Sequence, residues 1–143
     1  MNPVAPTIKR LRKVRSNRNE IVLRIIRKNE GIIIAVQEEQ MFEGKRSTGK
    51  KIGEYRPLTK RIKLGKGQPI DRVTLKDTGE FYEGLKISYE NDHFFITSDD
   101  PKTEAIIEQY GENVFGLMFK NWKELEKMII GDIKTYLDSR LWQ

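Results

Sequence analysis

Apolar residues recur at helical spacing near the start of the chain, where they define one face at Ile21, Val22, Ile25 and Ile26. This i, i+4 and i+5 spacing predicts a helix that ends at about Lys28. Either Asn17 or Asn19 can cap its first turn, since an asparagine side chain accepts hydrogen bonds from backbone N–H groups that the helix leaves free.

A second helix is expected over residues 32–42, after a break at Asn29-Glu30-Gly31. Its inner stripe runs through Ile32, Ile33, Val36 and Gln40. One bent helix covering both segments is the alternative, because a single interior glycine costs only about 1 kcal/mol.

Alternation of apolar and polar residues begins near Arg72 and predicts a small antiparallel sheet. A first strand carries Val73 and Leu75 and ends at the turn Asp77-Thr78-Gly79. A hairpin follows, in which Asn91-Asp92 forms the turn. Its apolar positions are Leu85, Ile87 and Tyr89 on the outgoing strand and Phe94 and Ile96 on the return strand.

Two further helices complete the expected elements. Ser98-Asp99-Asp100-Pro101 stops the last strand and starts a helix over residues 102–110, which Gly111 ends. Asn121 is expected to cap the final helix, whose apolar stripe is Trp122, Leu125, Ile129, Ile133, Tyr136 and Leu137. The predicted fold is α+β, with N-terminal helices, a small antiparallel sheet and a long C-terminal amphipathic helix in one domain over residues 19–143.

The composition fits one domain with a modest core, because 37% of the 143 residues are hydrophobic and 34% are charged. The longest apolar run, residues 32–36, is too short to cross a bilayer, and we expect no membrane contact. No signal-type apolar stretch follows the basic N-terminus, which favours an intracellular protein or one assembled from an intracellular pool. Residues 1–18 are predicted to form an extended basic arm that orders on a partner; a disordered tail is the alternative.

Charge is divided unevenly along the chain. Residues 1–72 contain 19 lysines and arginines against seven acidic residues, whereas residues 73–143 contain eight against 14. This division favours a protein that stacks on its own copies or bridges unlike surfaces. A solvated chain with uneven charge is the alternative.

Residues 43–68 are predicted to form an exposed basic loop. Between Gly44 and Lys66 there are nine lysines and arginines against the single acid Glu54, and the glycines and prolines argue against a regular buried element. A loop this long in a small domain is usually functional or disordered. The residues expected to hold it on the body are Ile52, Tyr55, Leu58, Ile62 and Leu64.

Catalytic chemistry finds little support in the sequence. Cysteine is absent and His93 is the only histidine, so thiol chemistry and histidine-rich metal sites are excluded. The segment from Gly44 to Lys51 resembles a phosphate-binding P-loop but has lysine where a hydroxyl should bind Mg²⁺. The acidic cluster of Asp99, Asp100, Glu104 and Glu108 is better explained by helix capping than by acid–base catalysis. We therefore expect a protein that is not an enzyme and has no cofactor or metal.

The basic arm and the basic loop are the candidate contact regions for a partner or for DNA. Lysine and arginine contact phosphates without reading sequence, so a small non-specific DNA-binding module is the alternative function. The residues concerned are Lys9, Arg10, Arg12, Lys13, Arg15, Lys45, Arg46, Lys50, Lys51, Arg56, Lys60 and Arg61.

Three short motifs occur in order along the chain: Thr78-Gly79-Glu80-Phe81 before the hairpin, Gln109-Tyr110-Gly111-Glu112, and Phe115-Gly116-Leu117 before the last helix. This succession resembles the tail-completion, or virion-morphogenesis, proteins of tailed bacteriophages. The basic segment between Gly44 and Gly53, followed by Tyr55, also resembles a loop of such connector proteins. The chain departs from the common pattern at Gly84, where serine is frequent, and at Met118-Phe119-Lys120.

The resemblance implies a structural role in the virion, which is assembled in the host cytoplasm. Such proteins form homo-oligomeric rings at the neck, the head–tail connector, and dock on portal, connector or tail proteins. Contact with packaged DNA would be non-specific. Under this resemblance, Thr78, Gly79, Tyr110, Gly111 and Gly116 are landmarks of the fold.

Overall fold

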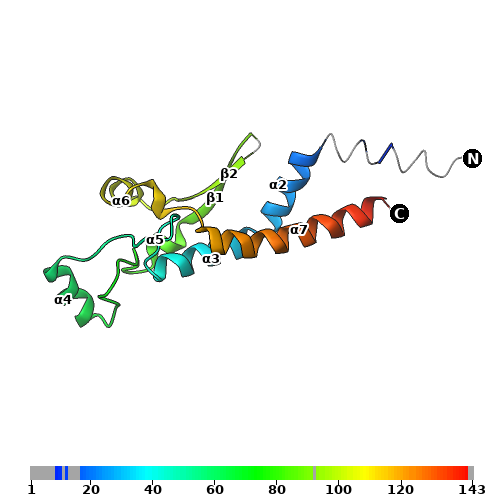
Figure 1. Ribbon diagram of the computed structural model, residues 1–143. Coiled ribbons are helices and arrows are strands. Elements are labelled where there is room, and N and C mark those ends of the chain that lie inside the picture. Colours follow the sequence, from blue (N-terminus) through cyan, green and yellow to red (C-terminus); the bar gives the residue numbers. More distant parts are fainter. Residues whose placement is uncertain (1–8, 11, 13–16, 92, 142–143) are drawn as a thin grey trace, which may run out of the picture.

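The structure, a computed structural model, describes residues 9, 10, 12, 17–91 and 93–141. Within these residues the chain has the α+β fold that the sequence predicted, with a two-stranded antiparallel sheet and a long C-terminal helix (Figure 1). In chain order the elements are α2 (Arg18–Lys28), α3 (Glu30–Phe42), α4 (Pro57–Gly65), α5 (Glu80–Glu83), β1 (Leu85–Glu90), β2 (His93–Ser98), α6 (Thr103–Tyr110), the 3₁₀-helix η1 (Glu112–Val114) and α7 (Phe119–Leu141).

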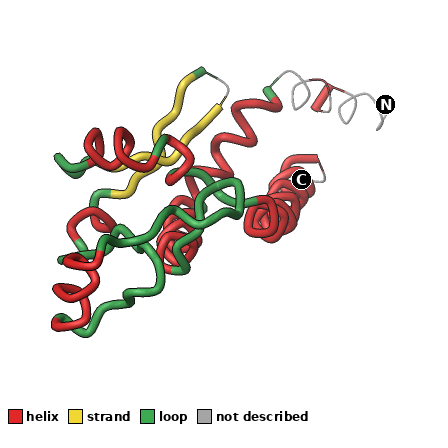
Figure 2. The backbone as a smooth tube through the Cα atoms, turned by 60° about the vertical axis from the view of Figure 1, so that its left-hand side comes forward, coloured by secondary structure: helices red, strands yellow, loops and turns green. Residues whose placement is uncertain are grey.

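One main apolar core joins α2, α3, α5, the hairpin and α7, which together we call the body. Helix α4 lies apart, at the opposite end of the molecule from the described N-terminal residues (Figure 1, Figure 2). Burial of the apolar side chains of the main core is the main force that holds the body together. The buried members of this core are Ile25, Ile26, Ile33, Met41, Phe81, Tyr82, Leu85, Ile96, Leu125 and Ile129.

A sharp corner at Asn29 separates α2 from α3, which confirms the predicted break but shortens it to one residue. The buried Asn29 side chain donates to the Ile25 carbonyl at 2.8 Å and to the Asp132 carboxylate of α7 at 2.9 Å. Gly31, expected in the break, lies inside α3. On α3 the buried face contains Gln37 as well as Gln40, whereas Ile32 is 47% exposed.

The hairpin follows the predicted register, with Ile87 opposite Ile96 and Glu90 opposite His93. Asn91, in its turn, has a φ of 51°, a conformation that asparagine tolerates better than most residues. Gly84 precedes β1 at a point of close approach. A Cβ there would lie 2.7 Å from the Ser98 Oγ and 3.0 Å from the Asp100 nitrogen, which gives a packing reason for glycine at this position.

The strand predicted around Val73 and Leu75 is wrong, because residues 72–79 form no strand in the structure. Val73 and Thr74 are buried in irregular backbone. Two tyrosine hydroxyls take the place of a partner strand: Tyr55 accepts from the Thr74 N–H at 3.0 Å, and Tyr82 donates to the Thr74 carbonyl. The alternation of apolar and polar residues therefore predicted neither the strand nor the burial of Thr74.

The landmark glycines lie at joints between elements. Gly79, Gly111 and Gly116 have φ values of 94°, 90° and 97°, in the left-handed region that other residues adopt with strain. Gly79 precedes the short helix α5, so the turn Thr78-Gly79 leads into a helix before the hairpin begins. Gly111 ends α6, as predicted.

Two buried glutamines of α3 hold the chain that leads into α7. The Gln37 Oε1 accepts from the Gly116 N–H and the Gln40 Oε1 accepts from the Met118 N–H, both at 2.8 Å. The Gln40 Nε2 donates to the Gly116 carbonyl at 2.9 Å. Because this backbone has no strand or helix partner of its own, the amides supply the hydrogen bonds that burial requires. We call this arrangement the glutamine clamp.

Helix α7 begins at Phe119, so the prediction that Asn121 caps it is wrong. The Asn121 side chain donates instead to the Gln40 Oε1 at 2.9 Å. Leu125 and Ile129 of the predicted stripe are buried, whereas Trp122 is 36% exposed.

Most of the predicted N-terminal arm lies outside the described residues, including Lys13 and Arg15. Lys9, Arg10 and Arg12 have helical backbone, which differs from the extended conformation expected at these positions.

Candidate interaction surfaces

The predicted basic loop is a structured segment in its central part. We call residues 44–66 the basic projection. Its first part is a tight turn in which Lys45 pairs with Lys51 and the Ile52 N–H donates to the Gly44 carbonyl at 2.8 Å. Its second part is helix α4, which corrects the expectation of a loop throughout. Pro57 stands in the first helical turn, where its missing N–H and fixed φ favour helix initiation.

Several polar groups of this turn form hydrogen bonds within the protein. The Ser47 N–H donates to the Asn113 carbonyl at 2.8 Å, and the Gly49 N–H to the Arg46 carbonyl at 2.8 Å. Arg46 donates to the carbonyls of Lys51 at 3.1 Å and Ile52 at 2.6 Å. The Ser47 and Gly49 amides and the Arg46 guanidinium are therefore bonded within the protein itself, and Arg46 stabilises the turn.

A few polar contacts attach α4 to the rest of the molecule. Lys63 is 9% exposed, and its Nζ donates to the Lys76 carbonyl at 3.1 Å and lies 4.9 Å from the centre of the Tyr55 ring. Lys66 forms an ion pair of 2.7 Å with Asp77. The hydrogen bond from Lys66 lowers the pKa of the Asp77 carboxyl.

The apolar side chains of α4 point outward. Leu58, Ile62 and Leu64 are 68%, 53% and 64% exposed, so the expectation that they hold the segment on the body is wrong. Ile52 and Tyr55 do contribute to a second small core, together with Val73 and Val114. Arg56, Lys60 and Arg61 of the same segment are also exposed. The surface of α4 is therefore both apolar and basic.

An apolar groove lies on another part of the molecule. It has a volume of about 520 Å³ and lies between β2, α6 and the first turn of α7. The Phe94 and Trp122 rings are 5.9 Å apart, and Phe95 is 41% exposed. Glu112 lines the groove, and α6, which contributes Ile107, also carries the exposed Glu104 and Glu108. We call it the acid-rimmed groove.

The predicted contact residues fall into two separate regions. Lys9, Arg10 and Arg12 lie near the N-terminus, at the opposite end of the molecule from α4 (Figure 1). Of the contact residues predicted within the basic projection, Lys45 and Arg46 are half-buried, whereas Lys50, Lys51, Arg56, Lys60 and Arg61 are exposed. The groove was missed from sequence, although its aromatic members Phe94, Phe95 and Trp122 stand out as apolar residues at the ends of elements.

The ionisable groups suspected of chemistry have ordinary structural partners. His93 is exposed and lies 3.5 Å from the Glu90 carboxylate. Asp99 pairs with Lys86, and the Asp100 Oδ1 accepts from the Lys102 N–H at 2.8 Å. Among the residues that the structure describes, no group of three or more histidine or acidic side chains is arranged to hold a metal.

Burial raises the pKa of three tyrosines, Tyr82, Tyr89 and Tyr110, and the first two also donate hydrogen bonds through their hydroxyls. Burial raises the pKa of Tyr82, whose hydroxyl is bonded to the Thr74 carbonyl. Burial, and then the hydrogen bond to Glu30, raises the pKa of Tyr89. Both hydroxyls therefore stay protonated and serve as hydrogen-bond donors within the fold.

The chain matches no protein-family model, no curated protein and no solved structure. Over the described residues, no helix combines the length and the apolar character that crossing a bilayer requires.

Proposed function

We propose that the protein is a structural subunit of the head–tail connector of a tailed bacteriophage, built by head-to-tail association of identical copies. It would reside in the virion, at the neck, in contact with portal or tail proteins. The order of the landmark motifs supports this role, and the landmark glycines occupy joints of the fold.

The observation that carries the proposal is a pair of complementary surfaces on one chain. Helix α4 presents Leu58 and Ile62, exposed and four residues apart, on a segment that also carries exposed cations, and the acid-rimmed groove presents aromatic side chains together with the Glu112 carboxylate. Because the two surfaces differ, contact between them is heterologous, and repeating it produces a ring or a filament. We propose α4 of a second copy as the occupant of the groove, since both its apolar and its charged groups match.

Native mass spectrometry and light scattering of the purified protein test the association. We expect a ring that the double variant L58S/I62S dissociates, with affinity lower by at least about tenfold, because each apolar side chain buried contributes about 1.5–3 kcal/mol. The control is I32S/I130S, which removes two similarly exposed isoleucines elsewhere and leaves the assembly intact.

Charge reversal makes the test specific to the proposed pair of surfaces. K60E/R61E and E108K/E112K each weaken association, and the two sets combined restore it. Binding of a different protein at the groove, with no self-association, would contradict the proposed occupant. A stable monomer that is absent from purified virions would contradict the connector proposal.

Non-specific DNA binding is the second candidate, favoured by the exposed cations Lys50, Lys51, Lys60 and Arg61 on one segment. It predicts an affinity for duplex DNA that falls steeply with salt. The variant K50Q/K51Q lowers that affinity, whereas L58S/I62S leaves it unchanged. Failure to bind duplex DNA at low salt would dismiss this function.

A further inference from the structure

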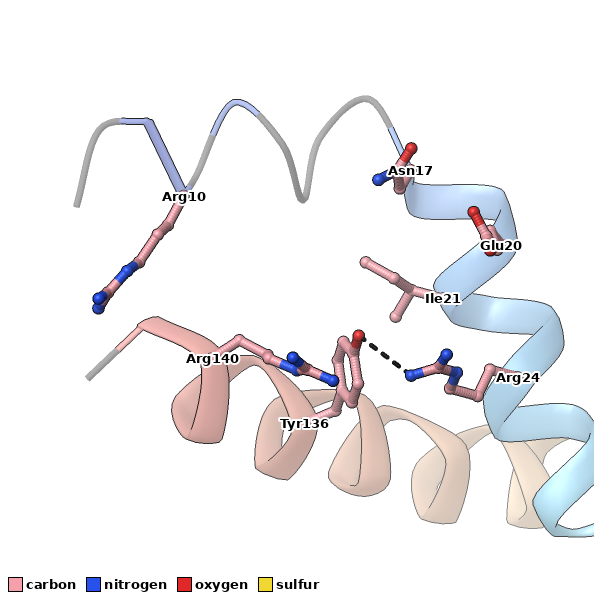
Figure 3. A pocket seen from close by; sticks show the side chains of 7 residues that line it. All are labelled: Arg10, Asn17, Glu20, Ile21, Arg24, Tyr136 and Arg140. Carbon is pink, nitrogen blue, oxygen red and sulfur yellow. Dashed lines mark hydrogen bonds between the residues drawn. The ribbon is translucent and has the colours of Figure 1, made fainter. Parts of the chain in front are cut away.

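A second cavity lies between α2 and the C-terminal end of α7 (Figure 3). This end of α7 is at the opposite end of the molecule from α4 (Figure 1). It has a volume of about 420 Å³. Three arginines line it from different parts of the chain: Arg10, Arg24 and Arg140. Among the described residues that line this cavity, none belongs to the basic projection.

Tyr136 brings two of these arginines together. The guanidinium carbons of Arg24 and Arg140 lie 5.7 and 5.3 Å from the centre of its ring. The Arg24 Nη1 also donates to the Tyr136 hydroxyl at 3.5 Å, which leaves the hydroxyl proton available to another acceptor. Figure 3 shows all three side chains at the gap between the helices.

Arg10 closes the cavity from the N-terminal side. Its Nη1 donates to the carbonyl of Leu141 at 3.2 Å, at the end of α7, where free carbonyls favour a cation. This contact joins positions 131 residues apart in the chain and places Arg10 at the C-terminal end of α7.

The described charges of the cavity are mostly positive. Among the described residues that line the cavity, the charged side chains are those of Arg10, Arg24, Arg140 and Glu20. No ion pair found among the described residues involves Arg24 or Arg140. The Arg24 and Arg140 guanidinium groups, set against the single described carboxylate of Glu20, favour a phosphate group, which carries about −1.5 to −2 at neutral pH. Guanidinium forks also match phosphate oxygens in geometry.

We propose that this cavity binds a phosphate group, carried either by a small polyphosphate ligand or by a nucleic-acid backbone. The proposal stands independently of the connector role. The volume exceeds what a single phosphate fills, since one water occupies about 30 Å³ of liquid. The ligand class is therefore a polyphosphate, a nucleotide or a short stretch of nucleic acid.

Isothermal titration of the full chain with pyrophosphate at low salt tests the proposal. We expect saturable binding with one ligand per chain, which R24Q/R140Q weakens by at least about tenfold because two charge-assisted contacts are lost. Both arginines are exposed, so the variant keeps the fold, and circular dichroism checks it. The matched control K60Q/R61Q removes two exposed cations of α4 and binds as the wild type does.

Two further variants sharpen the test. R140K keeps the positive charge but removes the planar guanidinium with its paired N–H donors, so we expect an intermediate affinity for pyrophosphate. E20Q removes the opposing carboxylate and strengthens binding by about two- to fivefold, the ratio expected for an exposed charge pair. No heat at low salt, or an equal loss in R24Q/R140Q and K60Q/R61Q, would overturn the proposal.

A parallel titration with a ten-nucleotide single strand distinguishes the two sources of phosphate. Tighter binding of the strand than of pyrophosphate, lost in R24Q/R140Q, assigns the cavity to nucleic acid. Binding of pyrophosphate alone assigns it to a small ligand. L58S/I62S serves in both titrations as the association-deficient chain, so that a failure of the connector proposal leaves this result readable.

Discussion

Ile33 of α3 is fully buried, whereas Ile62 of α4 is 53% exposed, although both are isoleucines within a helix. Ile33 belongs to the main core, which α2, α3, α5, the hairpin and α7 build together. Helix α4 is attached largely through polar groups, the buried Lys63 and the ion pair of Lys66 with Asp77. The body is therefore stabilised by its own core, while the apolar side chains of α4 in the basic projection are available to another molecule.

The largest expected effect comes from the same substitution made in both regions. I33A removes a fully buried side chain and leaves a cavity, so we expect the free energy of unfolding to fall by about 2–5 kcal/mol. I62A removes an exposed one and changes it by less than about 0.5 kcal/mol. Urea denaturation measures both. An equal loss at the two sites would mean that α4 is part of the core.

The glutamine clamp extends the comparison from apolar to polar burial. Q40L preserves the approximate volume but leaves the Gly116 carbonyl and the Met118 N–H without partners, so we expect a loss of about 1–3 kcal/mol. The control is Q109L on the exposed side of α6, with a change below about 0.5 kcal/mol. Similar stability of the two variants would show that water replaces the clamp.

The smallest effect concerns the attachment of α4 and depends on pH. The pKa of Asp77 is lowered in the folded state by Lys66, so the ion pair stabilises the attachment above the unfolded pKa of 3.8. That contribution is lost as the pH falls through the folded pKa. Hydrogen exchange of residues 57–66, relative to the core of α3, should therefore increase between pH 6 and pH 3.

D77N is the control for this titration. It should show faster exchange in α4 already at pH 6 and a smaller further increase on acidification. Exchange in α4 that is the same in D77N and the wild type at pH 6 would mean that Lys63 alone holds the helix.

Several elements could be predicted from the sequence because one local feature specifies each of them. The hairpin is correct because alternation of Leu85, Ile87 and Tyr89 reports a half-buried strand, and its return strand begins a short turn later. Helix α6 is correct because Gly111 supplies the positive φ that ends it. The sequence also held a helical signal for α4, since Leu58 and Ile62 are four residues apart after Pro57. The density of charges and glycines nevertheless favoured a loop.

Other features depend on contacts between distant positions, which no local pattern records. The irregular backbone at Thr74 is stabilised by Tyr55 and Tyr82, each supplying a hydroxyl that no strand pattern predicts. The cavity brings Arg24 to Arg140 across the fold. From sequence, only Arg10 of its three arginines was identified as a contact residue.

The glutamine clamp also constrains the order in which the chain can become stable during synthesis. Gln37 and Gln40 leave the ribosome long before residues 114–121, whose backbone and side-chain groups they bind. A nascent chain that ends before residue 114 has both amides on the inner face of α3 without these partners. The body therefore reaches its final stability only when the start of α7 has been made, and shorter nascent chains are the ones on which chaperones and proteases act.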